Sequence, residues 1–221
     1  ATPAASPRTP SSRRWHDPLY PAIDDIPGAG DIDELDELRR AGHALNAGDR
    51  IDRSAVWAAK RAALELLWDR FTGSPAHDRF VAERGEELVR WATYCALADE
   101  HQATWRHWPE QFRRPDSPAV AAHAASHPRQ VGFWAWLQWL LDEQIRPDGD
   151  PVVVSDLAVG FSADGADAWE WQDLLAEGVR IGAPPDILGP DGQDWGLPPF
   201  IPRRGRCAPR CATLVGCAST T

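Results

Sequence analysis

Methionine is absent from this chain of 221 residues, and no apolar run approaches the length of a membrane span. No leader with a charged start and an apolar centre opens the sequence. These absences argue against a membrane protein, and we expect a cytoplasmic one. The missing initiator also favours interpreting the chain as a fragment of a longer protein.

Basic residues are in deficit: Lys and Arg total 23 against 33 Asp and Glu, a formal net charge of −10. Binding along a nucleic-acid backbone needs clustered cations, so we expect no nucleic-acid partner. Cysteine is scarce as well. Cys95 falls on an apolar helical face, which predicts a buried side chain. Cys207, Cys211 and Cys217 have no later His to complete a zinc site, so we expect no metal and no cofactor.

Helical periodicity dominates the chain up to about residue 145. Amphipathic or apolar patterns predict helices over residues 55–71, 77–100, 117–127 and 130–144. Ser54 is expected to cap the first of these. The acids of residues 24–37 do not have the spacing of a calcium loop, and they predict a solvated helix whose first turn favours negative charge.

Tryptophan is abundant, which invites a carbohydrate-binding interpretation. Packing explains most of the indoles, because they recur at helical core spacing: Trp57, Trp68, Trp91, Trp134, Trp136 and Trp139. Trp195 lies between glycines in a Pro-rich stretch, where packing explains less. Lys60 interrupts the apolar stripe of its helix, which fits either a residue facing a cleft or an apolar stem with a solvated amine.

The stretch of residues 151–200 differs from the helices before it. The run Val152–Val154 predicts a buried strand of the parallel-sheet type, followed by a loop over residues 160–166. A second loop carries an acid, an amide and an indole: Asp186, Gln193 and Trp195. Such a set suits a ligand rich in hydroxyl groups, because carboxylates and amides bind hydroxyls and an aromatic face packs on a sugar ring.

These motifs resemble the amylomaltase (4-α-glucanotransferase) family. Its third strand reads Gly-Asp-Leu-Pro-Ile-Tyr-Val and continues into Asp-Ser-Ala-Asp-Val-Trp, which residues 155–161 and 164–169 match. Residues 181–186 and 192–198 match its Val-Gly-Ala-Pro-Pro-Asp and Gly-Gln-x-Trp-Gly-x-Pro. Residues 6–18 are similar to its first barrel loop, and residues 105–109 to a Trp-x-x-Trp-Pro passage.

The resemblance implies an α/β fold: an incomplete (β/α)₈ TIM barrel with a large inserted helical subdomain, mostly helical in this part. A complete barrel needs about 250 residues. The implied divisions are a first barrel loop region (1–30), a helical subdomain with barrel helices (31–147) and the third strand with substrate-binding loops (148–202). Residues 203–221 form an irregular tail rich in Arg and Cys, which we interpret as a frameshift artefact; a disordered tail is the alternative.

The resemblance also implies transfer of α-1,4-glucan segments between maltodextrins by a retaining double displacement. The family's nucleophile lies in an Arg-x-Asp-His passage that this chain lacks, so no catalytic residue is assigned and the chain itself is expected to be inactive. Substrate-binding roles carry over to Asp164, beside the scissile bond, and to Asp186, Gln193 and Trp195. Asp156 and Asp167 match family acids, but we expect them to be structural, with Asp167 capping a helix that begins at Ala168.

Several departures mark the chain as divergent. Arg8 replaces a substrate-stacking Tyr of the family, Asp17 replaces Asn, and Ala158 and Gly160 replace Pro and Tyr. Two other functions therefore stay open from sequence. One is a non-catalytic α-glucan-binding protein, and the other is a helical interaction module whose Trp-rich faces meet a partner.

Overall fold

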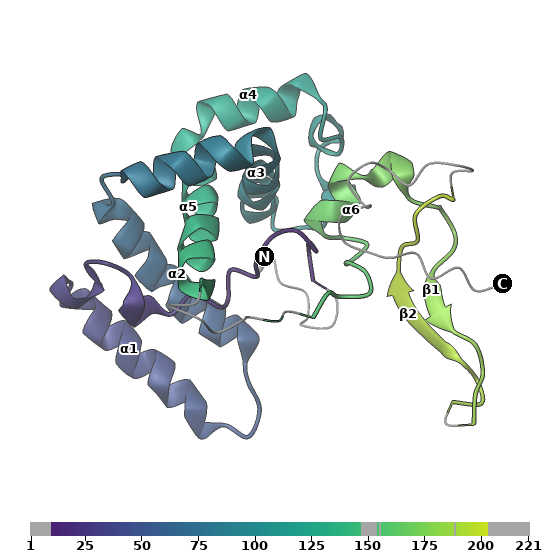
Figure 1. The fold of residues 1–221 in the computed structure, drawn as a ribbon, viewed down its shortest axis with the longest axis horizontal. Coiled ribbons are helices and arrows are strands. Elements are labelled where there is room, and N and C mark those ends of the chain that lie inside the picture. The colour runs from purple at the N-terminus through teal and green to yellow at the C-terminus, as the bar shows by residue number, and fades with distance from the viewer. Residues whose placement is uncertain (1–9, 147–153, 155, 188, 203–221) are drawn as a thin grey trace.

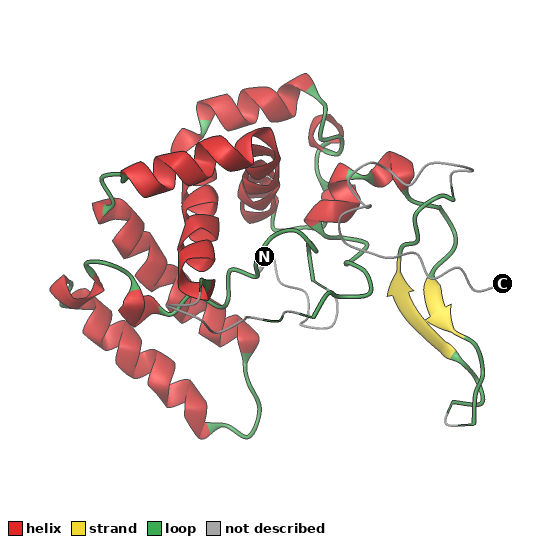
Figure 2. Cartoon of the chain, in the orientation of Figure 1, coloured by secondary structure: helices red, strands yellow, loops and turns green. Residues whose placement is uncertain are grey.

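The computed structural model describes residues 10–146, 154, 156–187 and 189–202, and these residues are mostly helical (Figures 1 and 2). The α-helices are α1 (Glu34–Ala44), α2 (Arg53–Arg70), α3 (Pro75–His101), α4 (Pro118–Ser126), α5 (Pro128–Ile145) and α6 (Ala166–Glu170). Single 3₁₀ turns join them: η1 (Ile23–Asp25), η2 (Ala29–Asp31), η3 (Leu45–Ala47), η4 (Trp105–His107), η5 (Glu110–Phe112) and η6 (Gln172–Leu174). Two strands, β1 (Ile181–Ala183) and β2 (Gln193–Leu197), follow.

The four helices predicted over residues 55–144 are confirmed as α2 to α5, with corrections at their ends. Asp52, not Ser54, caps α2, because its extended backbone lets the carboxylate accept a hydrogen bond from the Ala55 amide at 2.9 Å. Ser74 caps α3 in the same way, accepting from the His77 amide at 3.1 Å. Proline occupies the first turn of α3, α4 and α5, where a missing N–H is harmless.

Two segments depart from the predicted helices. In the acidic segment, only the turns η1 and η2 form before α1 begins at Glu34, because Pro27 and Gly28 interrupt a helix there. Helix α3 is kinked at Gly85, whose φ of 55° and ψ of −139° are not helical. Only glycine adopts this conformation readily, which explains the residue at that position.

The main core lies among α2, α3 and α5, with α1 against α2 and α4 near the ends of α3 and α5 (Figure 1). Its centre is aromatic: the Trp134 ring lies 5.9 Å from that of Trp57 and 6.1 Å from that of Trp91. The prediction that these indoles pack, rather than bind ligand, is confirmed for them and for Trp136. Cys95 is buried as predicted, and burial raises the pKa of its thiol well above the ordinary value.

The chain after α6 forms an antiparallel hairpin of β1 and β2 at the opposite end of the molecule from α1 (Figure 1). Ala183 pairs with Gln193 and Gly182 with Asp194, and the register shifts between Ile181 and Gly182. The sequence analysis predicted loops here, which is wrong for both strands. Four of the five β2 residues are exposed, so the strand has no alternation of apolar and polar residues to reveal it.

The predicted strand Val152–Val154 falls mostly outside the described residues, which exclude Val152 and Val153. Val154 is described; it is 85% exposed and belongs to no strand. The expectation of a buried strand is therefore wrong at Val154, because no neighbouring strand among the described residues pairs with it. None of the described helices has the length and apolarity that crossing a bilayer requires.

Candidate functional site

Asp164 lies in the tight turn that leads into α6, and its carboxylate faces an arginine from the helical part of the chain. Arg106 Nη1 donates to Asp164 Oδ1 at 2.5 Å and to the carbonyl oxygen of Ala163 at 2.6 Å. The Arg106 guanidinium stacks on the Trp105 ring, 4.3 Å from its centroid. About half of each charged side chain is exposed, so a ligand can reach this pair.

Two buried side chains support the same turn from its helical side. The Tyr94 hydroxyl of α3 donates to the Asp164 carbonyl oxygen at 2.6 Å, and Trp105 Nε1 donates to the Ala163 carbonyl at 3.3 Å. Burial raises the pKa of the Tyr94 hydroxyl, so it remains a protonated donor at physiological pH. The backbone that carries Asp164 is thus fixed by groups remote in sequence.

The segment of residues 10–14, called the strap below, holds the turn from its other side. The Ser162 amide donates to the Pro10 carbonyl at 2.9 Å, and the Ala166 amide donates to Ser11 Oγ at 3.0 Å. Gly165 lies against Ser11 so closely that a Cβ would be 2.4 Å from the Ser11 carbonyl oxygen. Only glycine permits this approach, so the strap and the turn fit together as one unit.

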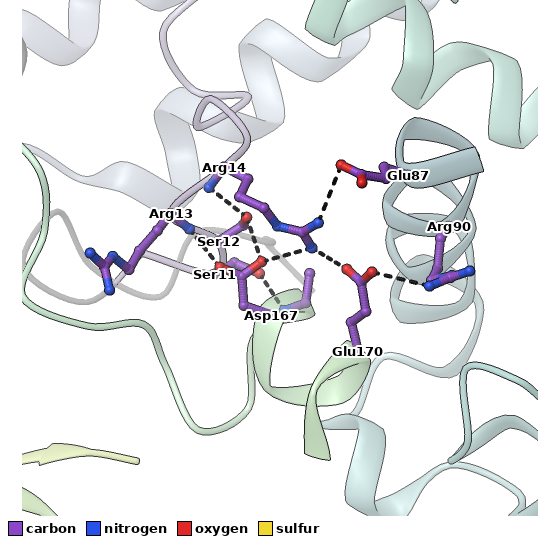
Figure 3. Close-up of polar contacts among 9 residues, drawn as sticks. Ser11, Ser12, Arg13, Arg14, Glu87, Arg90, Asp167 and Glu170 are labelled. Atoms are coloured by element: carbon purple, nitrogen blue, oxygen red, sulfur yellow. Dashed lines mark hydrogen bonds and ion pairs between the residues drawn. The ribbon is translucent and has the colours of Figure 1, made fainter. Parts of the chain in front are cut away.

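Asp167 connects the strap to α6 (Figure 3). Its fully buried carboxylate accepts from Ser12 Oγ at 2.7 Å, from the Arg13 amide at 2.8 Å and from Arg14 Nη2 at 3.4 Å. The prediction that Asp167 caps a helix is wrong, because α6 begins at Ala166 and the Asp167 side chain turns to the strap instead. Burial raises the pKa of the Asp167 carboxyl, although the donors around it oppose the rise.

Arg14 extends this network to α3. Its guanidinium forms ion pairs with Glu170 of α6 and with Glu87 of α3, the latter at 3.7 Å, and Arg90 reaches Glu170 at 3.2 Å (Figure 3). The guanidinium also lies over the Trp171 ring, 4.3 Å from its centroid. Three segments, the strap, α3 and α6, therefore meet beneath the Asp164 turn.

The other predicted site residues lie together on the hairpin. Trp195 Nε1 donates to Gln193 Oε1 at 2.9 Å, because the two residues are neighbours on one face of β2, and the indole is 41% exposed. Asp186 lies in the loop that joins the strands, where its Oδ1 accepts from the Gly189 amide at 2.6 Å. The structure thus pairs Gln193 with Trp195 and leaves Asp164 on a separate loop.

A cavity of about 530 Å³ separates that loop from the hairpin. Ala163, the neighbour of Asp164, lines it on one side, and Gly196, the neighbour of Trp195, lines it on the other. Arginines that line the cavity include Arg106 and Arg114. Asp164, Asp186, Gln193 and Trp195 are not among its lining residues, and Gln193 lines a separate cavity of about 570 Å³ on the hairpin. The structure therefore displays the predicted binding groups on the turn and on the hairpin and does not gather them around one cavity.

The sequence analysis missed the supporting residues Tyr94 and Arg106. A weak signal existed for Arg106, since it lies within the Trp-x-x-Trp-Pro passage of residues 105–109. Of the two interpretations of Lys60, the structure favours a residue at a cleft, because Lys60 lines a cavity of about 290 Å³ near α1 and α2. Its amine donates to the carbonyls of Leu19 and Pro21 at 2.7 and 3.0 Å. Asp156 is exposed. The part of the chain that the structure describes contains no cluster of metal-ligating residues.

Comparisons with known proteins agree on one family. A sequence profile described as 4-alpha-glucanotransferase matches residues 1–206. A 4-alpha-glucanotransferase of Mycobacterium bovis is 41% identical over 215 residues, covering 90% of this chain and 30% of that protein. The Haemophilus influenzae 4-alpha-glucanotransferase is 32% identical, covering 90% and 33%. The chain thus spans about a third of the length of these curated relatives.

Solved structures agree with these sequence matches. The crystal structure of amylomaltase from Corynebacterium glutamicum superposes with a TM-score of 0.65 at 30% identity, covering 88% of this chain and 28% of that one. Amylomaltase from Streptococcus agalactiae in complex with acarbose gives a TM-score of 0.67 at 18% identity, covering 88% and 42%. The second match supports the fold alone.

Proposed function

This chain belongs to the 4-α-glucanotransferase family, and on that premise we propose that it forms the donor-sugar side of an α-1,4-glucan-transferring enzyme. The substrate class is α-1,4-glucan or maltooligosaccharide, and the reaction is a retaining double displacement in the cytoplasm. In such a reaction a carboxylate nucleophile and an acid/base lie about 5–5.5 Å apart. We place both of these groups on parts of the enzyme outside this chain.

In this proposal the chain contributes to a (β/α)₈ barrel. Residues 1–30 supply the first barrel loop region and residues 148–202 the third strand with its substrate-binding loops. Residues 31–147 form the inserted helical subdomain with barrel helices. Sites in such barrels lie on loops at the carboxyl ends of the strands, which agrees with binding groups on the loop before α6 and on the hairpin.

Each predicted binding residue has a distinct task. The Asp164 carboxylate accepts hydrogen bonds from hydroxyls of the donor sugar, and its exposed oxygens leave room for them. The Trp195 indole packs on a sugar ring or excludes water, which favours transfer to a sugar hydroxyl over hydrolysis. Gln193 orients that indole through its hydrogen bond, and Asp186 shapes the loop beside it.

One observation carries the proposal: residues distant in sequence fix the Asp164 turn, while about half of the Asp164 side chain remains exposed. The turn is supported from the helical side and by the strap, so the carboxylate is held before any ligand arrives. Pre-organisation of this kind lowers the entropy cost of binding a flexible oligosaccharide.

Titration of the full chain with maltoheptaose, followed by calorimetry, tests the donor-site assignment. Asp164→Asn should weaken binding about tenfold, because a charge-assisted hydrogen bond is lost. The matched control is Asp173→Asn, since Asp173 lines the cavity beside the Asp164 turn and is also exposed and paired with an arginine. Equal affinity in the two variants would refute the role of Asp164.

A transfer assay tests the proposal that the catalytic carboxylates lie outside this chain. The chain incubated with maltotriose should produce neither glucose nor longer oligomers, because the proposed catalytic carboxylates lie elsewhere. Trp195→Ala should reduce retention on amylose while leaving the helical content unchanged. Formation of glucose by the purified chain would contradict the proposal that catalysis needs further segments.

A further inference from the structure

We infer that Arg106 is a positioning residue that fixes the Asp164 carboxylate in the orientation that binds sugar, an inference that rests on the proposed function of Asp164. The motifs that carry Asp164, Asp186, Gln193 and Trp195 do not include Arg106, which lies 58 residues before Asp164 in the sequence. The role follows from how the two side chains meet in the folded chain.

A single N–H-bearing nitrogen of Arg106 contacts two consecutive residues of the turn. Nη1 donates to the Ala163 carbonyl at 2.6 Å and to Asp164 Oδ1 at 2.5 Å. The first contact fixes the backbone immediately before Asp164, and the second fixes the rotation of its carboxylate. The guanidinium therefore occupies Oδ1 of Asp164 and, by fixing the rotation of the carboxylate, also fixes the position of the second oxygen.

Arg106 is itself held in place, which distinguishes it from an ordinary surface arginine. Exposed ion pairs commonly contribute little to stability, because holding two long side chains together costs entropy. Here the guanidinium stacks on Trp105, whose ring is buried and whose Nε1 donates to the same Ala163 carbonyl. Trp105 and Arg106 thus both donate to the Ala163 carbonyl. Much of the side-chain entropy of Arg106 is therefore already lost before Arg106 contacts Asp164.

The same cavity contains a natural comparison for this pair. Arg114 is as exposed as Arg106 and binds Asp173 through both nitrogens, at 2.8 and 2.6 Å. The hydrogen bonds and ion pairs that Arg114 forms go to Asp173 and Asp116, which belong neither to the Asp164 turn nor to the proposed binding residues. Substitution of Arg114 therefore removes an arginine from the cavity lining without removing a contact that positions Asp164.

The experiment is a double-mutant cycle on the full chain, read out as maltoheptaose affinity by calorimetry. Arg106→Gln should weaken binding about tenfold in the native background and have little effect in an Asp164→Asn background. Arg106→Lys should restore part of the affinity, because the charge returns without the planar stack. Arg114→Gln should bind like the native chain. Amide hydrogen exchange at residues 163–165 should accelerate in Arg106→Gln alone.

The outcomes separate this inference from the proposed function. If Asp164→Asn loses affinity while Arg106→Gln keeps it, the positioning role is wrong and the donor site stands. If Arg106→Gln weakens binding equally in both backgrounds, Arg106 acts independently of Asp164, and the inference is again wrong. Absence of maltoheptaose binding by the native chain overturns the proposed function and this inference with it, whatever the exchange rates show.

Discussion

The helical region (residues 34–145) and the hairpin region (residues 175–202) bury their tryptophans to opposite extents. Trp134, in α5, is 1% exposed and packs against Trp57, Trp91 and Phe133, whereas Trp195, in β2, is 41% exposed. The same residue type therefore stabilises the first region and is available for contact in the second. The comparison teaches that abundance of tryptophan indicates a binding site only where the fold leaves the ring uncovered.

The hairpin region is attached to the rest of the molecule by a small set of contacts. The Ile201 amide donates to the Leu174 carbonyl at 2.8 Å, while the Ala176 amide donates to the Pro199 carbonyl at 2.9 Å within the hairpin region itself. Beneath them lies a small cluster formed by Phe161, Ala168 and Leu175, with Trp171 and Phe200 packed against it. We therefore expect stability to depend on the helical region and ligand contact on the hairpin.

The largest expected effect is the difference in stability between two variants, each with one tryptophan truncated, one in each region. Trp134→Ala should lower the free energy of unfolding by about 3–5 kcal/mol, because it removes a fully packed aromatic side chain. Trp195→Ala should change it by no more than about 0.5 kcal/mol, as exposed substitutions usually do. Urea denaturation followed by circular dichroism measures both. Similar losses in the two variants would show that the hairpin indole is a core residue.

A smaller effect is expected where the strap meets the turn before α6. Gly165→Ala should cost about 1–3 kcal/mol, because the added methyl group overlaps backbone atoms of Ser11 that no rotamer change can move. Gly165 has a φ of −85°, so the conformation itself suits alanine and the cost is steric. Gly30→Ala is the matched control, since a Cβ there meets nothing within 4 Å. Thermal denaturation of both variants measures the two losses in stability, and equal melting temperatures would contradict the steric explanation.

The smallest expected effect is the contribution of His123, in α4, to the pH dependence of stability. Burial lowers the pKa of His123, the stacked His127 and His101 lower it further, and Glu100 opposes them. A lowered folded-state pKa means that stability is fully present above the unfolded value of 6.5 and is lost as pH falls through the folded value. One such group changes stability by at most about 1.4 kcal/mol per pH unit.

His123→Gln should therefore flatten the decline in stability as pH falls below 6.5. The exposed His43 in α1 provides the control, and His43→Gln should leave the decline as it is in the native chain. No histidine follows His127 in the sequence, so no histidine of the hairpin region contributes to this decline. An unchanged slope in His123→Gln would show that another group dominates the decline, such as His16, whose pKa burial also lowers.

Sequence alone determined the helices, the packing of most indoles and the family of the chain. Helical periodicity arises from the local geometry of the backbone, so the apolar stripes of α2 and α5 could be read without knowing their neighbours. The family motifs are likewise continuous stretches, such as residues 164–169 and 192–198, whose order is preserved in the chain. Even here, the predicted cap of α2 was wrong: Asp52 caps the helix in place of Ser54, because both residue types are good caps and local chemistry does not separate them.

Tertiary structure decided everything that depends on residues remote in sequence. The contact between Ser12 and Asp167 spans 155 residues, and the pair of Arg106 and Asp164 spans 58. No periodicity encodes such pairs, because they form only when packing of the helices brings the strap, η4 and the turn before α6 together. The sequence thus determined which groups the chain offers to the proposed binding site, and the packing determined that Asp164 is held between the helical region and the strap.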